Sequence, residues 1–229
     1  MIEGDLDLSH VRRLGVLGDL HCEDATLERV LAFLRSAGTE ANVSVGDLMD
    51  GHGDPNRALS LLEDAQVLAV RGNHDRWLLT NRHRELPLAT SCAALSARSL
   101  SYLGSLPVTR SLSTARGRVL LCHGIANNDL AGVRPDESEA FVLERAEIAT
   151  LLNEGKFDFV ISGHTHHAML RRIGKLLLLN AGTLHSDYRR AFALFDLGAA
   201  RYQVFAVFPD AIELAADWSL HEQLAFWPP

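Results

Sequence analysis

Histidine, aspartate and asparagine gather at five points of the 229-residue chain, each directly after a short apolar run. The five clusters are Asp19-Leu20-His21, Gly46-Asp47, Gly72-Asn73-His74-Asp75, His123-Gly124 and Gly163-His164-Thr165-His166. In an open α/β sheet, sites form in the crevice at the carboxyl ends of the strands. We therefore expect five strand ends of one sheet to bring these side chains together. The neighbouring glycines let the backbone turn sharply and approach a ligand closely.

The pooled side chains have the chemistry of metal ligands. Seven are candidates: Asp19, His21, Asp47, Asn73, His123, His164 and His166. Carboxylate, amide and imidazole donors suit manganese, iron, zinc or nickel better than calcium or magnesium alone. Seven donors are too many for one such ion, whereas two ions that share a carboxylate divide them well. Such a pair, about 3.5–4 Å apart, clamps both oxygens of an in-line displacement at phosphorus and generates a hydroxide nucleophile near neutral pH.

Other phosphoryl-transfer and hydrolytic chemistries lack their motifs in this sequence. A hydroxide generated by metal ions needs no serine or cysteine nucleophile. The chain contains neither a Gly-rich Walker loop nor a G-x-S-x-G turn. Kinase, ATPase and serine-hydrolase functions are therefore disfavoured.

The segments that precede the clusters predict alternating strands and helices. Apolar residues at i, i+3, i+4 and i+7 predict a helix over 24–37, with Asp24 as its N-cap. Asp54 and Pro55 are typical of the N-cap and first position of a second helix. Strands are expected at 13–17, 41–45 and 66–70. This β-α-β-α-β order indicates an α/β fold with strands packed between helices.

The second half of the chain is expected to continue in the same manner. Residues 77–107 are weakly patterned and are predicted to be helical. Asp136 as N-cap, with Glu139 three residues on, predicts one long helix over 136–153. Further strands are expected at 118–122, 157–161, 176–180, 191–196 and 201–208. The tail from Asp210 has apolar residues without a clear period, and we expect it to cover a sheet edge.

Length, composition and charge indicate one ordinary globular domain over residues 1–229. Hydrophobic residues make up 47% and charged residues 22% of the chain, whose length leaves little room for two full domains. The formal net charge of −7 is a poor match for long nucleic acid or an anionic membrane. Bound divalent cations would offset that charge locally, so a small anionic substrate is still compatible with it.

The chain also carries signals of its compartment. Cys22, Cys92 and Cys122 do not form a disulfide pattern, so a reducing cytoplasm is the expected location. The first ten residues are acidic and lack the apolar core of a signal peptide. Apolar runs such as Leu176–Leu179 are too short to span a bilayer. We expect no membrane partner.

The order of the five clusters resembles that of the calcineurin-like metallophosphoesterase superfamily. All five family blocks are present, in order, between residues 19 and 166. A single block such as D-x-H is weak evidence, but the joint match is highly specific. The resemblance implies a single-domain α/β fold, a four-layer α/β/β/α sandwich with two central mixed sheets.

The resemblance also implies a role for each residue. The first metal is held by Asp19, His21 and His166, the second by Asn73, His123 and His164, and Asp47 bridges the two. His74 binds no metal but contacts the substrate phosphate and protonates the leaving oxygen, and Asp75 orients His74 by a hydrogen bond. A histidine beside two cations needs a carboxylate to stay protonated, and an alkoxide leaving group needs an acid. Asp75 can also be the N-cap of a helix that starts at Arg76.

A finer resemblance runs from Gly46 to Leu79. It is similar to the diadenosine-tetraphosphatase and protein-phosphatase branch, whose pattern is GDxxDRG followed by RGNHD. The phosphate-binding arginine of that pattern is absent here. His52 stands where that arginine would stand, either as a substrate contact or as a solvated loop residue, the second being favoured. Residues 180–183 resemble a turn of small bacterial phosphodiesterases and are expected to line the substrate side.

Several further residues adjoin the clusters and have ordinary structural explanations. Cys22 and Cys122 each flank a ligand, but the ligand set is complete without thiolates, so both are expected to be small buried residues. An Asn/Asp turn accounts for residues 127–129. The other histidines are expected to be surface or packing residues: His10, His83, His167, His185 and His221.

The sequence thus predicts a phosphoesterase that depends on two divalent transition-metal ions, manganese first, with iron, zinc, nickel or cobalt as alternatives. A phosphodiesterase with His74 as general acid is the first expectation. The alternatives are a phosphomonoesterase or a nucleotide or dinucleotide polyphosphate phosphatase, and a catalytically silent scaffold of the same fold. A small phosphoester or nucleotide is the expected substrate. A nuclease acting on long nucleic acid is disfavoured by the acidic charge, and the sequence leaves the oligomeric state open.

Overall fold

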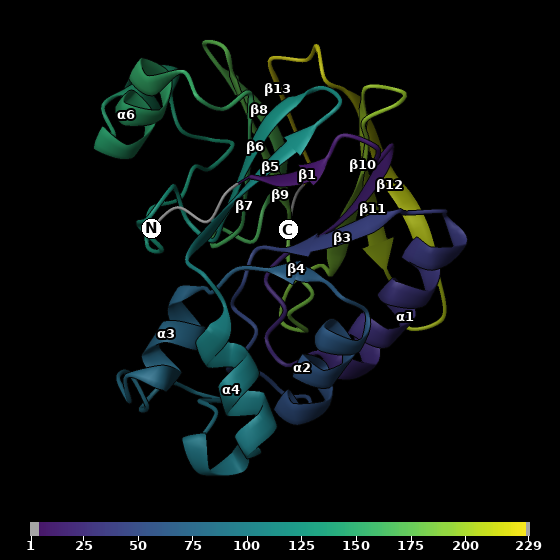
Figure 1. Ribbon diagram of the computed structural model, residues 1–229, viewed down its shortest axis with the longest axis vertical. Helices are drawn as coiled ribbons and strands as arrows, with labels where there is room; N and C mark the ends of the chain where they lie inside the picture. The colour runs from purple at the N-terminus through teal and green to yellow at the C-terminus, as the bar shows by residue number, and fades with distance from the viewer. Residues whose placement is uncertain (1–4, 228–229) are drawn as a thin grey trace.

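The computed structural model describes residues 5–227, and the strands of this part of the chain form two mixed sheets (Figure 1). The seven-stranded sheet has the order β1-β5-β6-β7-β9-β8-β13, and the six-stranded sheet has the order β12-β11-β10-β2-β3-β4. The predicted domain of residues 1–229 includes 1–4 and 228–229, which lie outside the described residues.

The elements have the following bounds. The six-stranded sheet consists of β2 (Arg13–Leu17), β3 (Ala41–Ser44), β4 (Leu68–Ala69), β10 (Ala191–Asp196), β11 (Arg201–Val207) and β12 (Ile212–Ser219). The seven-stranded sheet consists of β1 (Leu6–Leu8), β5 (Thr109–Thr114), β6 (Gly117–Cys122), β7 (Phe159–Ser162), β8 (Ala168–Ile173), β9 (Leu176–Ala181) and β13 (Leu224–Trp227). The helices are α1 (Asp24–Ser36), α2 (Pro55–Asp64), α3 (Asn73–Leu79), α4 (Ala97–Ser105), α5 (Glu139–Leu143) and α6 (Ala146–Glu154).

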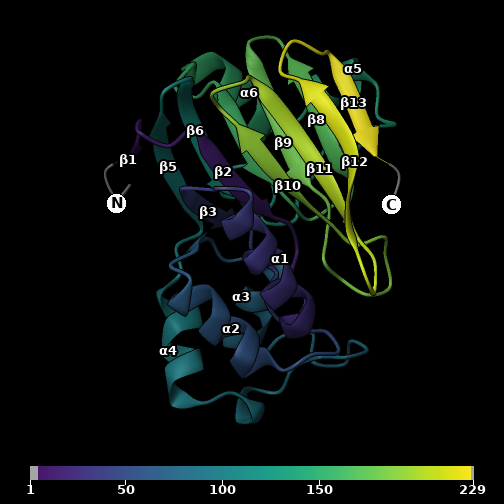
Figure 2. The ribbon, with the colours of Figure 1, turned by 90° about the vertical axis from the view of Figure 1, so that its right-hand side faces the viewer.

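Three hydrophobic clusters separate four layers and confirm the predicted α/β/β/α sandwich. One cluster fills the space between the sheets, where Val16 and Val43 face the same core as Leu121 and Ile161. A second cluster joins the six-stranded sheet to α1, α2 and α4. A third joins the seven-stranded sheet to α5 and α6. Figures 1 and 2 show α1 to α4 on one side of the paired sheets and α6 on the other.

The helices α1 and α2 form where the sequence predicted them, and their ends have clear causes. Leu27, Val30 and Leu34 are buried on one face of α1, as their spacing requires. Gly38, just past the helix, has a φ of 73°, a conformation that glycine adopts without steric cost. At the start of α2, the Asp54 side chain accepts hydrogen bonds from the backbone N–H groups of Asn56 and Arg57.

The predicted long helix over 136–153 is wrong, because the structure has two short helices there. Ser138, and not Asp136, caps the first of them, α5, by accepting a hydrogen bond from the N–H of Phe141. The backbone is extended at Arg145, which separates α5 from α6. The Arg145 guanidinium is held by Glu137, with an Nη1 to Oε2 distance of 2.9 Å, so the break is supported by a local ion pair.

Several strands of the structure were not predicted. In β8, Arg171 is buried because its guanidinium donates to the backbone carbonyls of Arg134 and Glu137. A charged residue interrupts the apolar pattern by which a buried strand is predicted, so β8 was not expected. The strands β1 and β5 are short or rich in serine and threonine. The tail after Asp210 forms β12 and β13, which lie at the edges of different sheets. The expectation that the tail covers a sheet edge is therefore confirmed in a more specific form.

Among the described residues, no helix is long and apolar enough to cross a membrane. The prediction that the chain start is not a signal peptide concerns residues 1–10. Residues 1–4 lie outside the described part, and Leu6–Leu8 form β1, so this prediction stays a prediction. The predicted cytoplasmic location stays a prediction.

The cap of α2 gives a direct test of this fold. We expect Asp54→Ala to lower the free energy of unfolding by about 1 kcal/mol, because two backbone N–H groups lose their acceptor. Urea denaturation measures the difference. Asp136→Ala is the matched control, since Asp136 caps no helix, and we expect its effect to stay within about 0.5 kcal/mol. Equal losses in the two variants would contradict the assignment of the caps.

Candidate metal centre

The five polar clusters meet at the junction of the two sheets. Asp19-His21, Asp47 and Asn73 follow β2, β3 and β4 of the six-stranded sheet, whereas His123 and the residues from His164 to His166 follow β6 and β7 of the seven-stranded sheet. The expectation that all five strand ends share one sheet is therefore wrong. The strands β2, β3, β6 and β7 run in parallel pairs within their sheets, so their carboxyl ends point to the same region.

Four of the seven candidate ligands adopt a left-handed backbone conformation. The φ angles are 47° at His21, 47° at Asp47, 66° at His164 and 59° at His166. Residues other than glycine rarely adopt this conformation, which costs about 1–3 kcal/mol each and persists where the surroundings impose it. Such strained positions gather at functional sites. The backbone therefore turns sharply to aim these side chains inward.

The first group of side chains consists of Asp19, His21 and His166. The Nε2 atoms of His21 and His166 are 3.3 Å apart, and the His166 Nε2 is 3.3 Å from the Asp19 Oδ2. The other ring nitrogen of His21 donates to the backbone carbonyl of Asp50 at 2.9 Å. This hydrogen bond fixes the ring and leaves a lone pair on Nε2, an arrangement common for histidines that bind metals.

The second group consists of Asn73, His123 and His164. The Asn73 Oδ1 is 2.9 Å from the His123 Nε2 and 3.0 Å from the His164 Nδ1. The His123 Nδ1 is 3.0 Å from the backbone carbonyl of Val45, so the carbonyl orients this ring as well. Turned over, the Asn73 amide would instead donate to both rings and to the Asp129 carbonyl. Only the first orientation presents oxygen to a cation.

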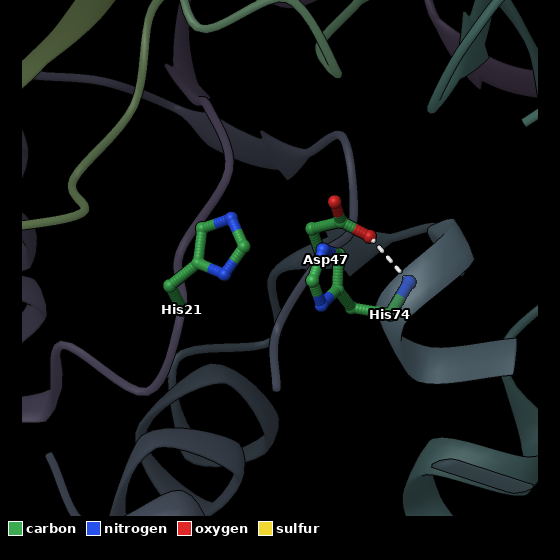
Figure 3. Close-up of side chains that lie close together, drawn as sticks. All are labelled: His21, Asp47 and His74. Atoms are coloured by element: carbon green, nitrogen blue, oxygen red, sulfur yellow. Dashed lines mark hydrogen bonds between the residues drawn. The ribbon is translucent and has the colours of Figure 1, made fainter. Parts of the chain in front are cut away.

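Asp47 lies between the two groups. Its Oδ2 is 3.2 Å from the His123 Nε2, and its Oδ1 accepts a hydrogen bond from the backbone N–H of His74 at 2.9 Å. The donor atoms of Asp47 lie within 4.8 Å of those of His21 and His74 on one side and of those of His123 and His164 on the other, so its carboxylate can share a cation with either group. Figure 3 shows the His21 ring to one side of Asp47 and the hydrogen bond from the His74 backbone N–H to the Asp47 carboxylate.

The donor set fits cations better than it fits protons. Asp19, Asp47 and His123 are almost fully buried, and the Asp19 Oδ2 is a buried oxygen with no hydrogen-bond donor in the described residues. Burial raises the pKa of Asp19 to about 7. Burial alone would lower the pKa of His123, but the Asp47 and Asp19 carboxylates raise it to about 10. The buried carboxylates are thus stabilised by nearby positive charge. Divalent cations supply this charge without a proton on Asp19 or His123.

The remaining imidazoles are already in the form that binds metals. Burial lowers the pKa of His21 to about 4 and that of His166 to about 3. Burial also lowers the pKa of His164. Neutral imidazole is the ligating form, so these rings need lose no proton to bind a cation near neutral pH.

The two flanking cysteines are buried, as predicted from the sequence. Burial raises the pKa of Cys22 and of Cys122 to about 12. Both therefore stay thiols near neutral pH, whereas the thiolate is the form that ligates metal.

His74 is adjacent to Asp47 but is oriented by a residue that the sequence analysis did not select. The His74 Nδ1 donates to the Asp50 Oδ2 at 2.8 Å. Asp50 also accepts from the Arg84 guanidinium at 3.2 Å and from the backbone N–H of Thr90 at 2.7 Å. Burial alone would lower the pKa of His74, but the hydrogen bond to Asp50 and the charge of Asp47 raise it. Asp50 is the second acidic residue of the GDxxD pattern, which is the signal that could have identified it.

The predicted hydrogen bond from Asp75 to His74 is wrong. The Asp75 Oδ1 accepts from the backbone N–H groups of Leu48 and Met49, and its Oδ2 accepts from that of Gly72 at 2.9 Å. Asp75 is therefore the third residue of α3 and reaches back to its N-cap residue. Its alternative role as N-cap of a helix from Arg76 is also wrong, because α3 starts at Asn73. Asp75 positions the backbone of two loops and does not touch the His74 ring.

The turn at residues 180–183 packs against two of the loops that carry candidate ligands. Asn180 is buried and donates to the backbone carbonyl of Gly163 at 3.0 Å. Thr183 is also buried and donates to the backbone carbonyl of Asp19 at 2.8 Å. The turn thus supports two of the loops that carry candidate ligands, and the expectation that it lines the substrate side stays a prediction.

Two residues of the following loop, which the sequence analysis did not select, lie beside the first group. The His185 ring is 4.6 Å from that of His21, and the Tyr188 ring is 4.5 Å from that of His166, centroid to centroid. His185 had been expected at the surface or in packing, and it is buried. The His52 side chain is 54% exposed and lies 3.9 Å from Asp187, which agrees with the favoured solvated position.

Comparison with known proteins places the chain among phosphoesterases. A model of the calcineurin-like phosphoesterase superfamily domain matches residues 13–199. An uncharacterized protein from Methanocaldococcus jannaschii is 22% identical over 189 residues, which cover 79% of this chain and 73% of that protein. Serine/threonine-protein phosphatase 1 of Salmonella typhimurium is 33% identical over 78 residues, or 34% of this chain and 36% of the phosphatase.

A solved structure shows the same fold. The metallophosphoesterase from Sphaerobacter thermophilus superposes with a TM-score of 0.63 at 20% identity, over 90% of this chain and 89% of that one. The family match includes the five polar clusters, since residues 19 to 166 lie within the matched range of residues 13–199.

Gly72 tests the geometry of the centre. A Cβ added at this position would lie 2.2 Å from the Asp47 Oδ1, so Gly72→Ala must displace the carboxylate that both groups share. We expect the affinity for Mn²⁺ of the metal-stripped protein to fall about 10- to 100-fold, measured by titration calorimetry. Gly104→Ala in α4 is the control, because a Cβ there meets nothing within 4 Å. Unchanged Mn²⁺ binding by Gly72→Ala would count against this site.

Proposed function

The chain belongs to the calcineurin-like phosphoesterase superfamily and is a metal-dependent phosphoester hydrolase, and we propose that it is a phosphodiesterase in which His74 protonates the departing oxygen. The observation that carries the proposal is the pair formed by His74 and Asp50 at the edge of the metal centre. The His74 side chain is 22% exposed, whereas that of Asp50 is 2% exposed. A buried carboxylate therefore holds an imidazole that a substrate can reach.

The metal ions would be held by the two groups described above. Asp19, His21 and His166 would hold one, Asn73, His123 and His164 the other, and Asp47 would contact both. When bound, the ions would supply Lewis acidity and lower the pKa of a bound water. We propose manganese as the first candidate, with iron, zinc, nickel and cobalt as alternatives, because the donors are mixed oxygen and nitrogen.

The hydrogen bond to Asp50 decides which atom of His74 does the chemistry. Because Nδ1–H donates to the carboxylate, Nε2 is the ring nitrogen left to give a proton to the leaving oxygen. Asp50 stabilises the imidazolium before the transfer and keeps the ring in one orientation. The raised pKa of His74 keeps the acid protonated up to a higher pH than an isolated histidine. After the transfer, solvent can reprotonate the ring, since it is partly exposed.

The charges around His74 favour a diester over a monoester. The two arginines that adjoin the site are both engaged by carboxylates: Arg76 by Asp129 at 2.6 Å, and Arg84 by Asp50. A phosphomonoester carries close to two negative charges near neutral pH, whereas a diester carries one. Because both guanidinium groups are engaged by carboxylates, neither is free to bind the second negative charge of a monoester in addition to the metal ions.

A phosphomonoesterase is the second candidate. The identity to a serine/threonine-protein phosphatase over 78 residues favours it. A silent scaffold of the same fold is disfavoured, because binding alone does not require the Asp50–His74 pair beside the donor cluster.

The leaving group tests the role of His74. We expect His74→Ala to lower kcat about 10²- to 10⁴-fold on a diester with an alkyl leaving group, which needs protonation as it departs. The loss should be much smaller on bis(p-nitrophenyl) phosphate, whose phenolate leaves without an acid. The protein is stripped with EDTA and reloaded with Mn²⁺ before assay. His221→Ala, an exposed histidine, is the control. Equal rates of parent and His74→Ala on both esters would refute the acid role.

The pH profile tests Asp50. The acid works only when protonated, so activity falls as the pH rises through the pKa of His74. Asp50 raises that pKa, and Asp50→Asn therefore lowers it and moves the alkaline limb of the kcat profile to lower pH. We also expect kcat to fall more than KM changes. Asp64→Asn on the exposed end of α2 is the control. An alkaline limb that stays in place would show that Asp50 does not act through His74.

A further inference from the structure

A cavity of about 480 Å³ opens beside the first group of ligands. Its lining residues are Ser186, Tyr188, Arg189, Arg190, Ala206, Val207, Phe208 and Trp227. They come from the loop between β9 and β10, the end of β11, and β13. None of these residues belongs to the predicted ligand set or to the acid pair, so the cavity has no role in the chemistry proposed above.

Two contacts place the cavity next to the metal centre, and a third fixes the loop that lines it. The Tyr188 ring meets the His166 ring edge-on, with centroids 4.5 Å apart. Trp227 pairs with Ala168 across β13 and β8, two residues beyond His166. The backbone N–H of Val207 donates to the carbonyl of Arg190 at 2.9 Å, which fixes the loop against β11. Figure 2 shows the turn between β11 and β12 beside the loop that leads to β10.

The lining is aromatic and carries one available cation. Tyr188 is 46% exposed and Phe208 is 47% exposed, so both rings offer surface to a ligand. The Arg189 guanidinium lies 6.0 Å from the centre of the Trp227 ring and forms no ion pair among residues 5–227. Arg190, in contrast, is held by Glu23 at 3.1 Å.

We propose that this cavity binds the nucleoside of a nucleotide phosphodiester whose phosphate lies at the metal centre. The inference rests on the proposed function and names its substrate class. A heteroaromatic base has two flat faces that stack on tyrosine, phenylalanine or tryptophan, and such stacking tolerates different bases. The volume is within the range of sites that enclose small molecules. Tyr188 contacts His166 and also lines the cavity. A nucleoside bound in the cavity is therefore close enough for its ester linkage to reach a phosphate at the metal centre.

The charge of the cavity favours a nucleoside over an acyl chain. An acyl chain would make no hydrogen bond with the Arg189 guanidinium, which lines the cavity. A nucleoside has ring nitrogens, carbonyl oxygens and hydroxyl groups that accept hydrogen bonds from a guanidinium. The aromatic rings and Arg189 are thus both used by the same ligand.

Two substrates with one leaving group test the proposal. The p-nitrophenyl ester of thymidine 5′-monophosphate and p-nitrophenyl methyl phosphate release the same phenolate but differ in the retained group. With the Mn²⁺-loaded protein, we expect kcat/KM to be about tenfold or more higher for the nucleoside ester. Tyr188→Ala and Phe208→Ala should bring this ratio close to one. Phe141→Ala, which removes an equally exposed phenylalanine from α5, should leave the ratio unchanged.

A binding measurement separates this inference from the proposed function. Thymidine, which has no phosphate, is titrated into EDTA-treated protein, and we expect saturable binding that weakens about tenfold in Phe208→Ala. If neither ester is hydrolysed, the proposed function fails, and the thymidine titration still decides whether the cavity binds nucleosides. Hydrolysis of both esters at equal rates, or a ratio that persists in both aromatic variants, would overturn the inference. So would thymidine binding that is absent or equal in parent and Phe208→Ala.

Discussion

Two carboxylates buried at the junction of two sheets, Asp19 and Asp47, constrain the rest of the structure. Taking an ionised carboxylate out of water costs several kcal/mol even after relaxation, unless positive charge is near. Without cations, His123 would have to carry that charge, and the two carboxylates raise its pKa to about 10. A buried imidazolium cannot ligate a metal. Metal binding at the proposed site would therefore release this proton and replace it with charge that satisfies both carboxylates.

The same constraint explains the backbone around the centre. Side chains from two sheets must point at a common region, so the loops after β2, β3 and β7 turn sharply, and several ligands take left-handed φ angles. Glycine is needed beside these ligands because a side chain would collide with a neighbouring carboxylate, and not only because of the backbone conformation. A Cβ at Gly72 would strike Asp47, and one at Gly163 would lie 2.5 Å from the Asp19 Oδ1. The core between the sheets holds these loops in place, because it ties β2 and β3 to β6 and β7.

The sequence predicted the parts of this molecule whose signals are local. The helices α1 and α2 follow from apolar spacing and a capping aspartate, and the candidate ligands follow from residue type after apolar runs. The choice between one sheet and two was not available from such patterns, because strand pairing is a long-range property. The resemblance assigned to Asp75, the neighbour of His74 in sequence, the role that Asp50 has in the structure, where Asp50 reaches the ring from another loop. The strand β8 could not be predicted from apolar pattern, because it contains Arg171, whose buried charge is compensated only by contacts of the folded state.

Asp50 shows how closely metal binding and acid chemistry are linked in this fold. Its backbone carbonyl accepts the hydrogen bond that fixes the His21 ring, and its side chain accepts the one that fixes His74. A shift of this one residue therefore moves a predicted ligand and the predicted acid together. The proposed chemistry at phosphorus would depend on this shared support, and it would be the same for any phosphoryl group. Substrate choice must then come from residues outside the metal centre and the Asp50–His74 pair. Tyr188 is such a residue, because its ring contacts the candidate ligand His166 and also lines the aromatic cavity.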